Sequence, residues 1–285
     1  MGKWVPAVLL ALLMLLFPQI AMMGAREGLL LWFQNVLPAQ FPFMVCILFL
    51  LKSGMVSGKK ETLSIFLTGA LSGYPGGAKA AAVLYQEGRI SRRRLQWLMS
   101  FCNNAGPLFI VGTVGTGILK CPEAGYRILT AHLLSAILCG CVFLLRGKGE
   151  SFEIRKKTVR EKKAFGAELG DCVAEASAVM LMVGGFMMLY SVLIHLCETL
   201  WPAGNYLYVL LEMTNGAAIL GELPLKLAVP LIGTLVSMGG LAVYSQTCGV
   251  LGETPFSEIE YLAAKCLQGG LCGIVLWIWE RLWPM

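Results

Sequence analysis

Helix-breaking residues and an ionisable side chain interrupt the apolar segment 63–87. The segment contains the run GYPGG (Gly73–Gly77), and Lys79 follows two residues later. In lipid, irregular backbone is tolerated only where protein buries it or where it lines a wet cavity. A charged side chain at that depth is costly and usually functional. The run therefore predicts a binding site; the alternatives are a close helix contact through the glycines and a structural ion pair of Lys79.

Three further breaks carry polar residues: NNAGP (Asn103–Pro107), TNG (Thr214–Gly216) and SMGG (Ser237–Gly240). Glu212 is the acidic counterpart that we expect near Lys79. Unwound backbone offers carbonyl oxygens to cations, and helix N-termini attract anions. The residues that we predict to bind substrate are Gly73, Tyr74, Pro75, Gly76, Gly77, Lys79, Asn103, Asn104, Glu212, Thr214, Asn215, Gly239, Gly240 and Gln246.

The composition is that of a membrane protein. Of 285 residues, 57% are hydrophobic and 14% are charged, whereas about a quarter of an average soluble domain is charged. The mean hydropathy is +0.71. The net charge of +6 is attributed to membrane orientation and not to nucleic-acid binding. The sequence predicts an all-α polytopic membrane protein whose principal partners are the lipid bilayer and a small-molecule substrate.

Charges at the ends of the segments predict the topology, because lysine and arginine collect on the cytoplasmic side. Lys59-Lys60 precedes segment 63–87 and Arg89–Arg94 follows it, so both ends are cytoplasmic. Ten helical residues rise about 15 Å, half of a hydrocarbon core about 30 Å thick. The segment therefore predicts a re-entrant hairpin with GYPGG at its tip. The basic loop 146–163 is predicted to be cytoplasmic as well.

The pattern after this loop resembles the pattern before it and predicts an inverted-topology repeat, a common plan of secondary transporters. Residues 1–25 are expected to form a retained transmembrane helix, with a cleaved signal peptide as the alternative. The first repeat covers 26–145, the basic loop 146–165 and the second repeat 166–285. Each repeat begins with an amphipathic stretch, Arg26–Gln40 or Gly166–Ser177, which we expect to lie in the membrane interface. This plan predicts two re-entrant hairpins and broken transmembrane helices.

Signatures of enzymes are absent from the sequence: it contains no HExxH, GxSxG, Walker A or GxGxxG motif. We therefore predict a protein that is not an enzyme and has no cofactor or metal site, with Na⁺ and H⁺ both open as coupling ions. The ten cysteines are expected to pack as small apolar residues. His132 and His195 are expected to form hydrogen bonds between helices. A homo-oligomer is left open.

The blocks GALSGYPGGAKAAAVLYQEGRIS and LMSFCNNAGPLFIVGTVG resemble the sporulation integral membrane protein YlbJ family, and LLEMTNGAAIL and GGLAVYSQTCGVL fit it too. This family belongs to the nucleoside-recognition (Gate) domain group, which is similar to concentrative nucleoside transporters. The resemblance implies a bacterial cell-membrane protein with a Gate-type fold and a role in endospore formation. It also implies dipicolinate or a nucleoside-like heteroaromatic compound as the solute.

Together these observations predict a secondary transporter or permease for a small, anionic solute bound between the hairpin tips. The competing hypothesis is a non-transporting structural or partner-binding membrane protein required for assembly of the spore envelope. A polar midplane cavity would favour transport, and a solid apolar core would favour the second hypothesis.

Overall fold

A computed structural model describes residues 4–53, 61–146, 164–202 and 208–283. These residues are helical with connecting turns, and no strand occurs among them. The elements are α1 (Val5–Leu16), α2 (Pro18–Leu31), η1 (Trp32–Val36), α3 (Leu37–Lys52), α4 (Glu61–Ser72), α5 (Gly76–Gln86), α6 (Arg92–Met99), η3 (Leu108–Ile118), α7 (Pro122–Arg146), α8 (Phe165–Leu200), α10 (Met213–Gly221), α11 (Leu225–Met238), α12 (Gly240–Leu251) and α13 (Glu258–Leu282). The segments η1 and η3 are π-helices.

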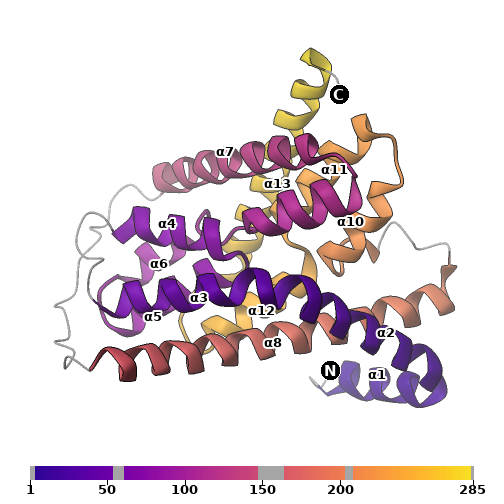
Figure 1. Cartoon of the computed structure of the whole chain (residues 1–285), viewed down its shortest axis with the longest axis horizontal. Helices are drawn as coiled ribbons and strands as arrows, with labels where there is room; N and C mark the ends of the chain where they lie inside the picture. Colours follow the sequence, from indigo (N-terminus) through magenta and orange to yellow (C-terminus); the bar gives the residue numbers. More distant parts are fainter. Residues whose placement is uncertain (1–3, 54–60, 147–163, 203–207, 284–285) are drawn as a thin grey trace.

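Among the described residues, five helical segments are long and apolar enough to cross a membrane: Pro18–Lys52, Pro122–Leu145, Phe165–Leu200, Leu225–Leu251 and Glu258–Leu282. The continuous helix formed by α2, η1 and α3 packs along α8, and α13 packs on α7 and α11. Figure 1 shows the first pair across the lower half of the view and α7 across the upper half, with the hairpin of α4 and α5 between them. The chain is thus an all-α polytopic membrane protein, as predicted.

The N-terminal segment differs from the prediction of one transmembrane helix over residues 1–25. Helix α1 ends at Leu16, Phe17 is not helical, and Pro18 begins α2. A residue before proline is disfavoured in the helical region because the proline ring clashes with it. The twelve residues of α1 rise about 18 Å, which is short for a core of about 30 Å.

The two amphipathic stretches are also not separate interfacial helices, which corrects that prediction. Arg26–Gln40 lies within the continuous helix Pro18–Lys52, and Gly166–Ser177 lies within α8. Glycines explain the packing of the first stretch. A Cβ on Gly24 would lie 2.8 Å from the Cα of Val192, and one on Gly28 would lie 2.8 Å from the Cα of Met188. The absent side chains let α2 approach the backbone of α8, so the apolar face meets protein.

Three of the four predicted breaks are found where the sequence places them. The first hairpin consists of α4 and α5 around Gly73–Pro75. Non-helical residues 100–106 separate α6 from η3 and contain Asn103 and Asn104. Helix α11 ends at Met238, and the next residue, Gly239, has a φ of 86°, in the left-handed region that favours glycine. The long helices α7 and α13 follow the two broken segments.

The predicted break at Thr214–Gly216 is wrong in position. These residues form the first turn of α10, and the unwound residues are Leu211 and Glu212 directly before it. The Glu212 side chain accepts hydrogen bonds from the backbone N–H groups of Thr214 and Asn215, both at 2.9 Å. Capping of this kind starts a helix, so the TNG run begins α10 and does not interrupt it.

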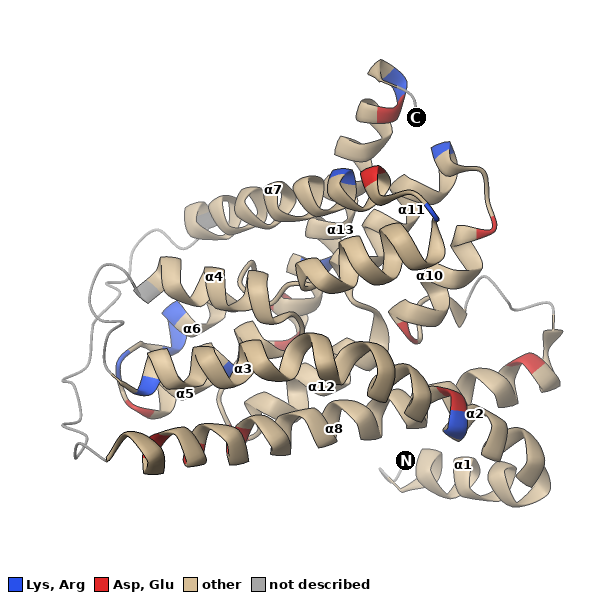
Figure 2. Cartoon of the chain, viewed as in Figure 1, with Lys and Arg blue, Asp and Glu red and all other residues tan. Residues whose placement is uncertain are grey.

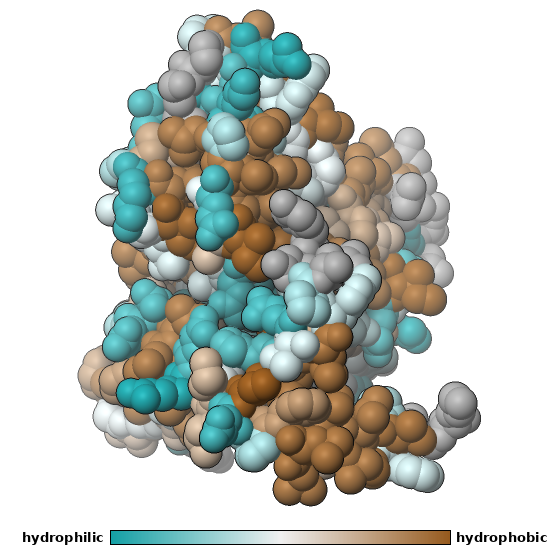
Figure 3. Space-filling view, turned by 90° about the vertical axis from the view of Figure 1, so that its right-hand side faces the viewer, coloured by the Kyte–Doolittle hydropathy of each residue, from teal (hydrophilic) through white to brown (hydrophobic). Residues whose placement is uncertain are grey.

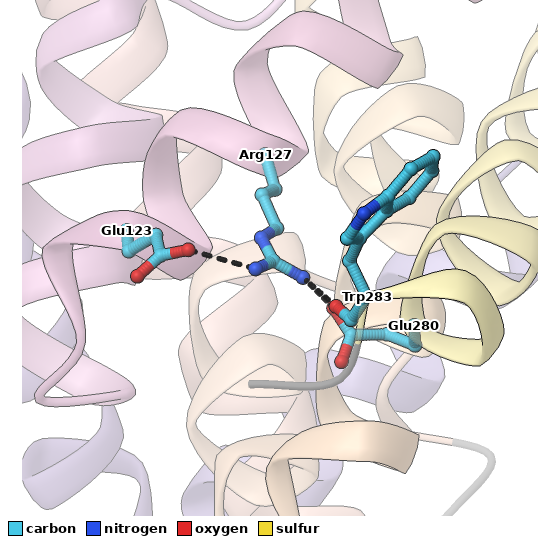
Figure 4. Close-up of polar contacts among 4 residues, drawn as sticks. All are labelled: Glu123, Arg127, Glu280 and Trp283. Atoms are coloured by element: carbon cyan, nitrogen blue, oxygen red, sulfur yellow. Dashed lines mark hydrogen bonds and ion pairs between the residues drawn. The ribbon is translucent and has the colours of Figure 1, made fainter.

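Charged residues hold the helix ends together. Arg127 on α7 contacts Glu123 at 2.7 Å, Glu280 on α13 at 3.1 Å and the Trp283 carbonyl oxygen at 2.6 Å (Figure 4). Basic residues also gather around α5 and α6, at the open end of the first hairpin (Figure 2). Lys59-Lys60 and residues 147–163 of the basic loop lie outside the described residues. The cytoplasmic placement of the loop, the domain boundaries and the inverted repeat therefore stay predictions.

Candidate functional site

A lysine that the sequence interpretation missed lies where the first hairpin, the first broken helix and α13 meet. Lys265 on α13 is 2% exposed. Its Nζ donates to the Asn103 carbonyl oxygen, to Gln268 Oε1 at 2.8 Å and to the Tyr74 hydroxyl at 3.4 Å. It also lies 5.1 Å from the centroid of the Tyr74 ring and 5.9 Å from that of Tyr261. In the part of the chain that the structure describes, no carboxylate lies within 4.0 Å of this Nζ.

The amides around Lys265 form a chain with fixed donors and acceptors. Asn104 Nδ2 donates to the Phe101 carbonyl oxygen at 2.7 Å, so Asn104 Oδ1 is free to accept. It accepts from Gln268 Nε2 at 3.0 Å, which turns Gln268 Oε1 toward Lys265. Asn103 Nδ2 contacts the Thr247 and Tyr261 hydroxyls at 3.0 and 2.9 Å. Fully connected buried networks of this kind make a junction rigid.

The same network joins the two broken helices. The Tyr74 hydroxyl is 3.2 Å from the carbonyl oxygens of Val236 and Ser237, at the end of α11. His132 accepts from the Ala105 N–H through Nε2 at 3.2 Å, and its Nδ1 lies 2.8 Å from Ser237 Oγ. His132 therefore bridges helices, as predicted. His195 does so as well, because its Nε2 lies 3.0 Å from Glu27 Oε2 on α2.

The tip of the first hairpin is tightly packed. Residues Gly73–Gly77, including Tyr74, Pro75 and Gly76, are all buried. A Cβ on Gly69 or Gly77 would lie 1.6 or 1.9 Å from the Cys102 carbonyl oxygen, so both arms are pressed against this carbonyl. The tip therefore has no room for a solute in this arrangement, and Tyr74 is its polar link to the rest of the network.

Lys79 contacts a different acid from the one expected. Its Nζ lies 2.5 Å from Glu175 Oε1 on α8, and Lys52 pairs with the other oxygen of the same carboxylate. Glu212, which is 3% exposed, caps α10 instead. The expectation that Glu212 partners Lys79 is wrong. Val83 on α5 shares a buried apolar cluster with Cys172 and Ala176 on α8, and this packing brings Lys79 to Glu175. The Glu175 carboxylate, on α8, joins the second arm of the first hairpin to α3 and α8.

An open cleft of about 640 Å³, with both polar and apolar residues in its lining, lies between the two π-helices and the start of α10. Its polar lining consists of Glu27, Gln34 and Asn35 from α2 and η1, Thr113 from η3, and Thr214 and Asn215 from α10. Figure 3 faces the side of the molecule on which α2 and α10 lie, and hydrophilic residues gather there between two mostly hydrophobic regions. Of these polar side chains, Thr214 is buried, Asn35, Thr113 and Asn215 are half-buried, and Glu27 and Gln34 are exposed, so the cleft is open to a solute.

The predicted site residues thus fall into separate groups. Thr214 and Asn215 line the cleft, and Asn103 and Asn104 belong to the Lys265 network with Tyr74. Gly239 and Gly240 form the second break, and Gln246 is buried in α12. Lys265 was missed although a signal was present. Tyr261, Lys265 and Gln268 recur at helical spacing and form a polar stripe on an otherwise apolar helix.

The fold and these contacts define a class: an integral, multi-pass α-helical membrane protein in which a hairpin and two broken helices meet around a buried polar network. The chain is similar to the sporulation integral membrane protein YlbJ of Bacillus subtilis (strain 168), with 28% identity over an alignment that covers 93% of this chain and 79% of that protein. This similarity supports the resemblance to the YlbJ family that the GYPGGAK and SFCNNAGP blocks predicted. No protein-family model matches the chain. No solved structure matches it either.

Proposed function

We propose that the protein is a secondary transporter or permease that moves a small polar solute through the cleft between η1, η3 and α10. The observation that carries this proposal is the position of the cleft. Asn35 is the central residue of the 35-residue helix Pro18–Lys52, about 25 Å from either end. Both π-helical segments line the cleft at this depth, and π-helical turns occur frequently at functional sites. Non-standard backbone around a polar cavity is how transporters of this class hold solutes.

The lining of the cleft favours a solute that is recognised by hydrogen bonds. Its polar groups are amides, hydroxyls and the Glu27 carboxylate, and it includes no lysine or arginine. Lys79, the group expected to hold an anion, is engaged by Glu175. We therefore favour a nucleoside-like heteroaromatic solute over dipicolinate, the anionic solute that the family resemblance suggests.

A second candidate function rests on the hairpin tip. Nearly all of the polar groups around Tyr74 and Lys265 are bonded to one another, and the tip is closed by backbone contacts. A rigid, solvent-free junction of this kind suits a structural membrane protein that supports assembly of the spore envelope. The two candidate functions differ in their use of the cleft: a transporter needs it to bind solute, and a structural membrane protein does not.

Thermal unfolding of the full chain in detergent, with and without ligand, separates the two candidates, because a ligand that binds the folded state raises its stability. The probes are uridine as a neutral heteroaromatic compound and dipicolinate as a dianion. We expect uridine to raise the unfolding temperature of the wild type and of Thr116→Val. We expect the increase to disappear in Thr113→Val, whose hydroxyl lines the cleft.

The control is closely matched because Thr116 belongs to the same π-helix but is exposed, and its hydroxyl bonds to the Val111 carbonyl oxygen. Uptake of the stabilising compound into proteoliposomes then tests transport itself. Stabilisation by dipicolinate and not by uridine would favour an anionic solute over a neutral one. Equal responses of the two threonine variants would remove the cleft from the mechanism and favour the structural role.

A further inference from the structure

The buried ammonium of Lys265 has the surroundings of a bound metal cation. In transporters with broken helices, unwound backbone carbonyls hold the coupling cation. Here the carbonyl of Asn103, in the unwound residues between α6 and η3, accepts from Lys265 Nζ. Gln268 Oε1 and the Tyr74 hydroxyl complete a set of three oxygen neighbours. Hard cations such as Na⁺ are bound by neutral oxygens of the same kinds.

The hydrogen-bond partners of Lys265 suit its charged form. The Asn103 carbonyl oxygen can only accept, and Gln268 presents its oxygen because its Nε2 donates to Asn104. The Tyr74 hydroxyl lies against the Val236 and Ser237 carbonyl oxygens, so its proton is directed to them and its lone pair faces Lys265. Three acceptors require three N–H donors, which an ammonium has and a neutral amine lacks. The faces of two tyrosine rings add attraction for a cation.

The absence of a carboxylate distinguishes this lysine from other buried and half-buried cations of the described residues. Buried Arg89 pairs with Glu87, half-buried Lys52 and Lys79 share Glu175, and half-buried Arg127 has Glu123 and Glu280. A lysine that only joins helices would be held at lower cost by an acid, since a buried charge is otherwise expensive. Instead, three neutral oxygens surround the ammonium: the Asn103 carbonyl, the Tyr74 hydroxyl and Gln268 Oε1. A metal ion with the same charge suits this position equally well.

We propose that the Lys265 ammonium is a tethered cation that occupies the position of a coupling ion, so that the protein works without Na⁺. This inference rests on the proposed transport function and adds its mode of coupling. It predicts that the wild type has no Na⁺ site at the junction. It also predicts that shortening the side chain to alanine frees three oxygens and a space, and thereby creates such a site.

The experiment compares unfolding temperatures of the full chain in detergent with NaCl and with choline chloride at equal ionic strength. We expect the wild type to unfold at the same temperature in both salts. We expect Lys265→Ala to be less stable than the wild type in choline chloride and to be stabilised by NaCl by about 2–4 °C. Lys265→Met is the matched control, because its side chain is neutral but fills the space, and it should show no difference between the salts.

Saturable stabilisation of the wild type by Na⁺ would overturn the proposal. An equal unfolding temperature of Lys265→Ala in the two salts would overturn it as well. Lys265→Ser, which adds an oxygen to the site, is the second variant should Lys265→Ala fail to fold in choline chloride. Folding of either variant only in NaCl supports the proposal, and failure of both in both salts overturns it. Because the measurement detects ion binding and not solute movement, its outcome is separate from the test of transport with uridine and dipicolinate.

Discussion

Two of the regions where the chain unwinds between apolar helices, the GYPGG tip and the start of α10, differ in how they use polar groups. At the tip, the backbone is enclosed: Gly69 and Gly77 contact the Cys102 carbonyl oxygen, and the Tyr74 hydroxyl is bonded on the far side. At α10, Glu212 caps the helix and turns inward, while Thr214 and Asn215 face a cleft. One region is a closed junction and the other is an accessible surface.

This difference shows that a helix break in an apolar segment does not by itself mark a binding site. Backbone groups freed by a break must be bonded, and either neighbouring protein or a wet cavity can do this. At the tip, protein supplies the partners, so substitutions there should change stability. At the start of α10, part of the polar surface is left to solvent or solute, so substitutions there should change binding.

The largest effect is expected from Gly77→Ala at the closed junction. The new Cβ would lie 1.9 Å from the Cys102 carbonyl oxygen, which is backbone and cannot move aside as a side chain does. We expect a loss of about 3 kcal/mol or more in the free energy of unfolding, measured as a fall of at least about 6 °C in unfolding temperature in detergent.

Gly185→Ala on α8 is the control for this substitution, since nothing lies within 4 Å of its Cβ position. Alanine is the better helix former, so this variant should match or slightly exceed the wild type in stability. A Gly77→Ala variant as stable as Gly185→Ala would mean that the tip is not closed, and the contrast between the two regions would then fail.

A smaller effect is expected from Glu175→Gln, which weakens the second attachment of the hairpin. The carboxylate holds Lys52 and Lys79, and both of these amines are largely buried. Glutamine keeps the shape but leaves two positive charges close together without compensation. Because the carboxylate is partly exposed, we expect a loss of about 2 kcal/mol. Thermal unfolding at low and high salt measures it, with Glu168→Gln on the same helix as the control. A loss shared equally by both variants would show that the ion pairs do not anchor the hairpin.

Local features of the sequence were enough to predict much of this architecture. Gly73 and Gly239 adopt positive φ angles, which glycine tolerates and other residues avoid, so both breaks are recognisable from residue type. Gly269 and Gly273 lie four residues apart in α13, a spacing typical of close packing between helices. A Cβ on either would meet α11, at Met238 Cγ (2.4 Å) or Thr234 Oγ1 (2.2 Å).

Contacts between distant segments could not be predicted in this way. Whether Lys79 meets Glu175 or Glu212 depends on which helix packs beside α5, and neither charge carries that information. The merging of Arg26–Gln40 into a long helix likewise depends on α8, which receives Gly24 and Gly28. The cleft is harder still to foresee, because the π-helical turns that line it have no residue signature comparable to GYPGG.

The smallest effect on stability is expected from Thr113→Val at the open cleft, although this is the variant expected to lose ligand binding. The Thr113 side chain is partly exposed and lines a space that already lacks protein partners. Valine preserves its shape, so no packing is lost and no buried group is left unbonded by the change. We expect the free energy of unfolding to stay within about 0.5 kcal/mol of the wild type and of Thr116→Val, measured by denaturation without ligand. A large loss would mean that the Thr113 hydroxyl is bonded within the protein. The start of α10 would then be a second closed junction, and the distinction between the two regions would disappear.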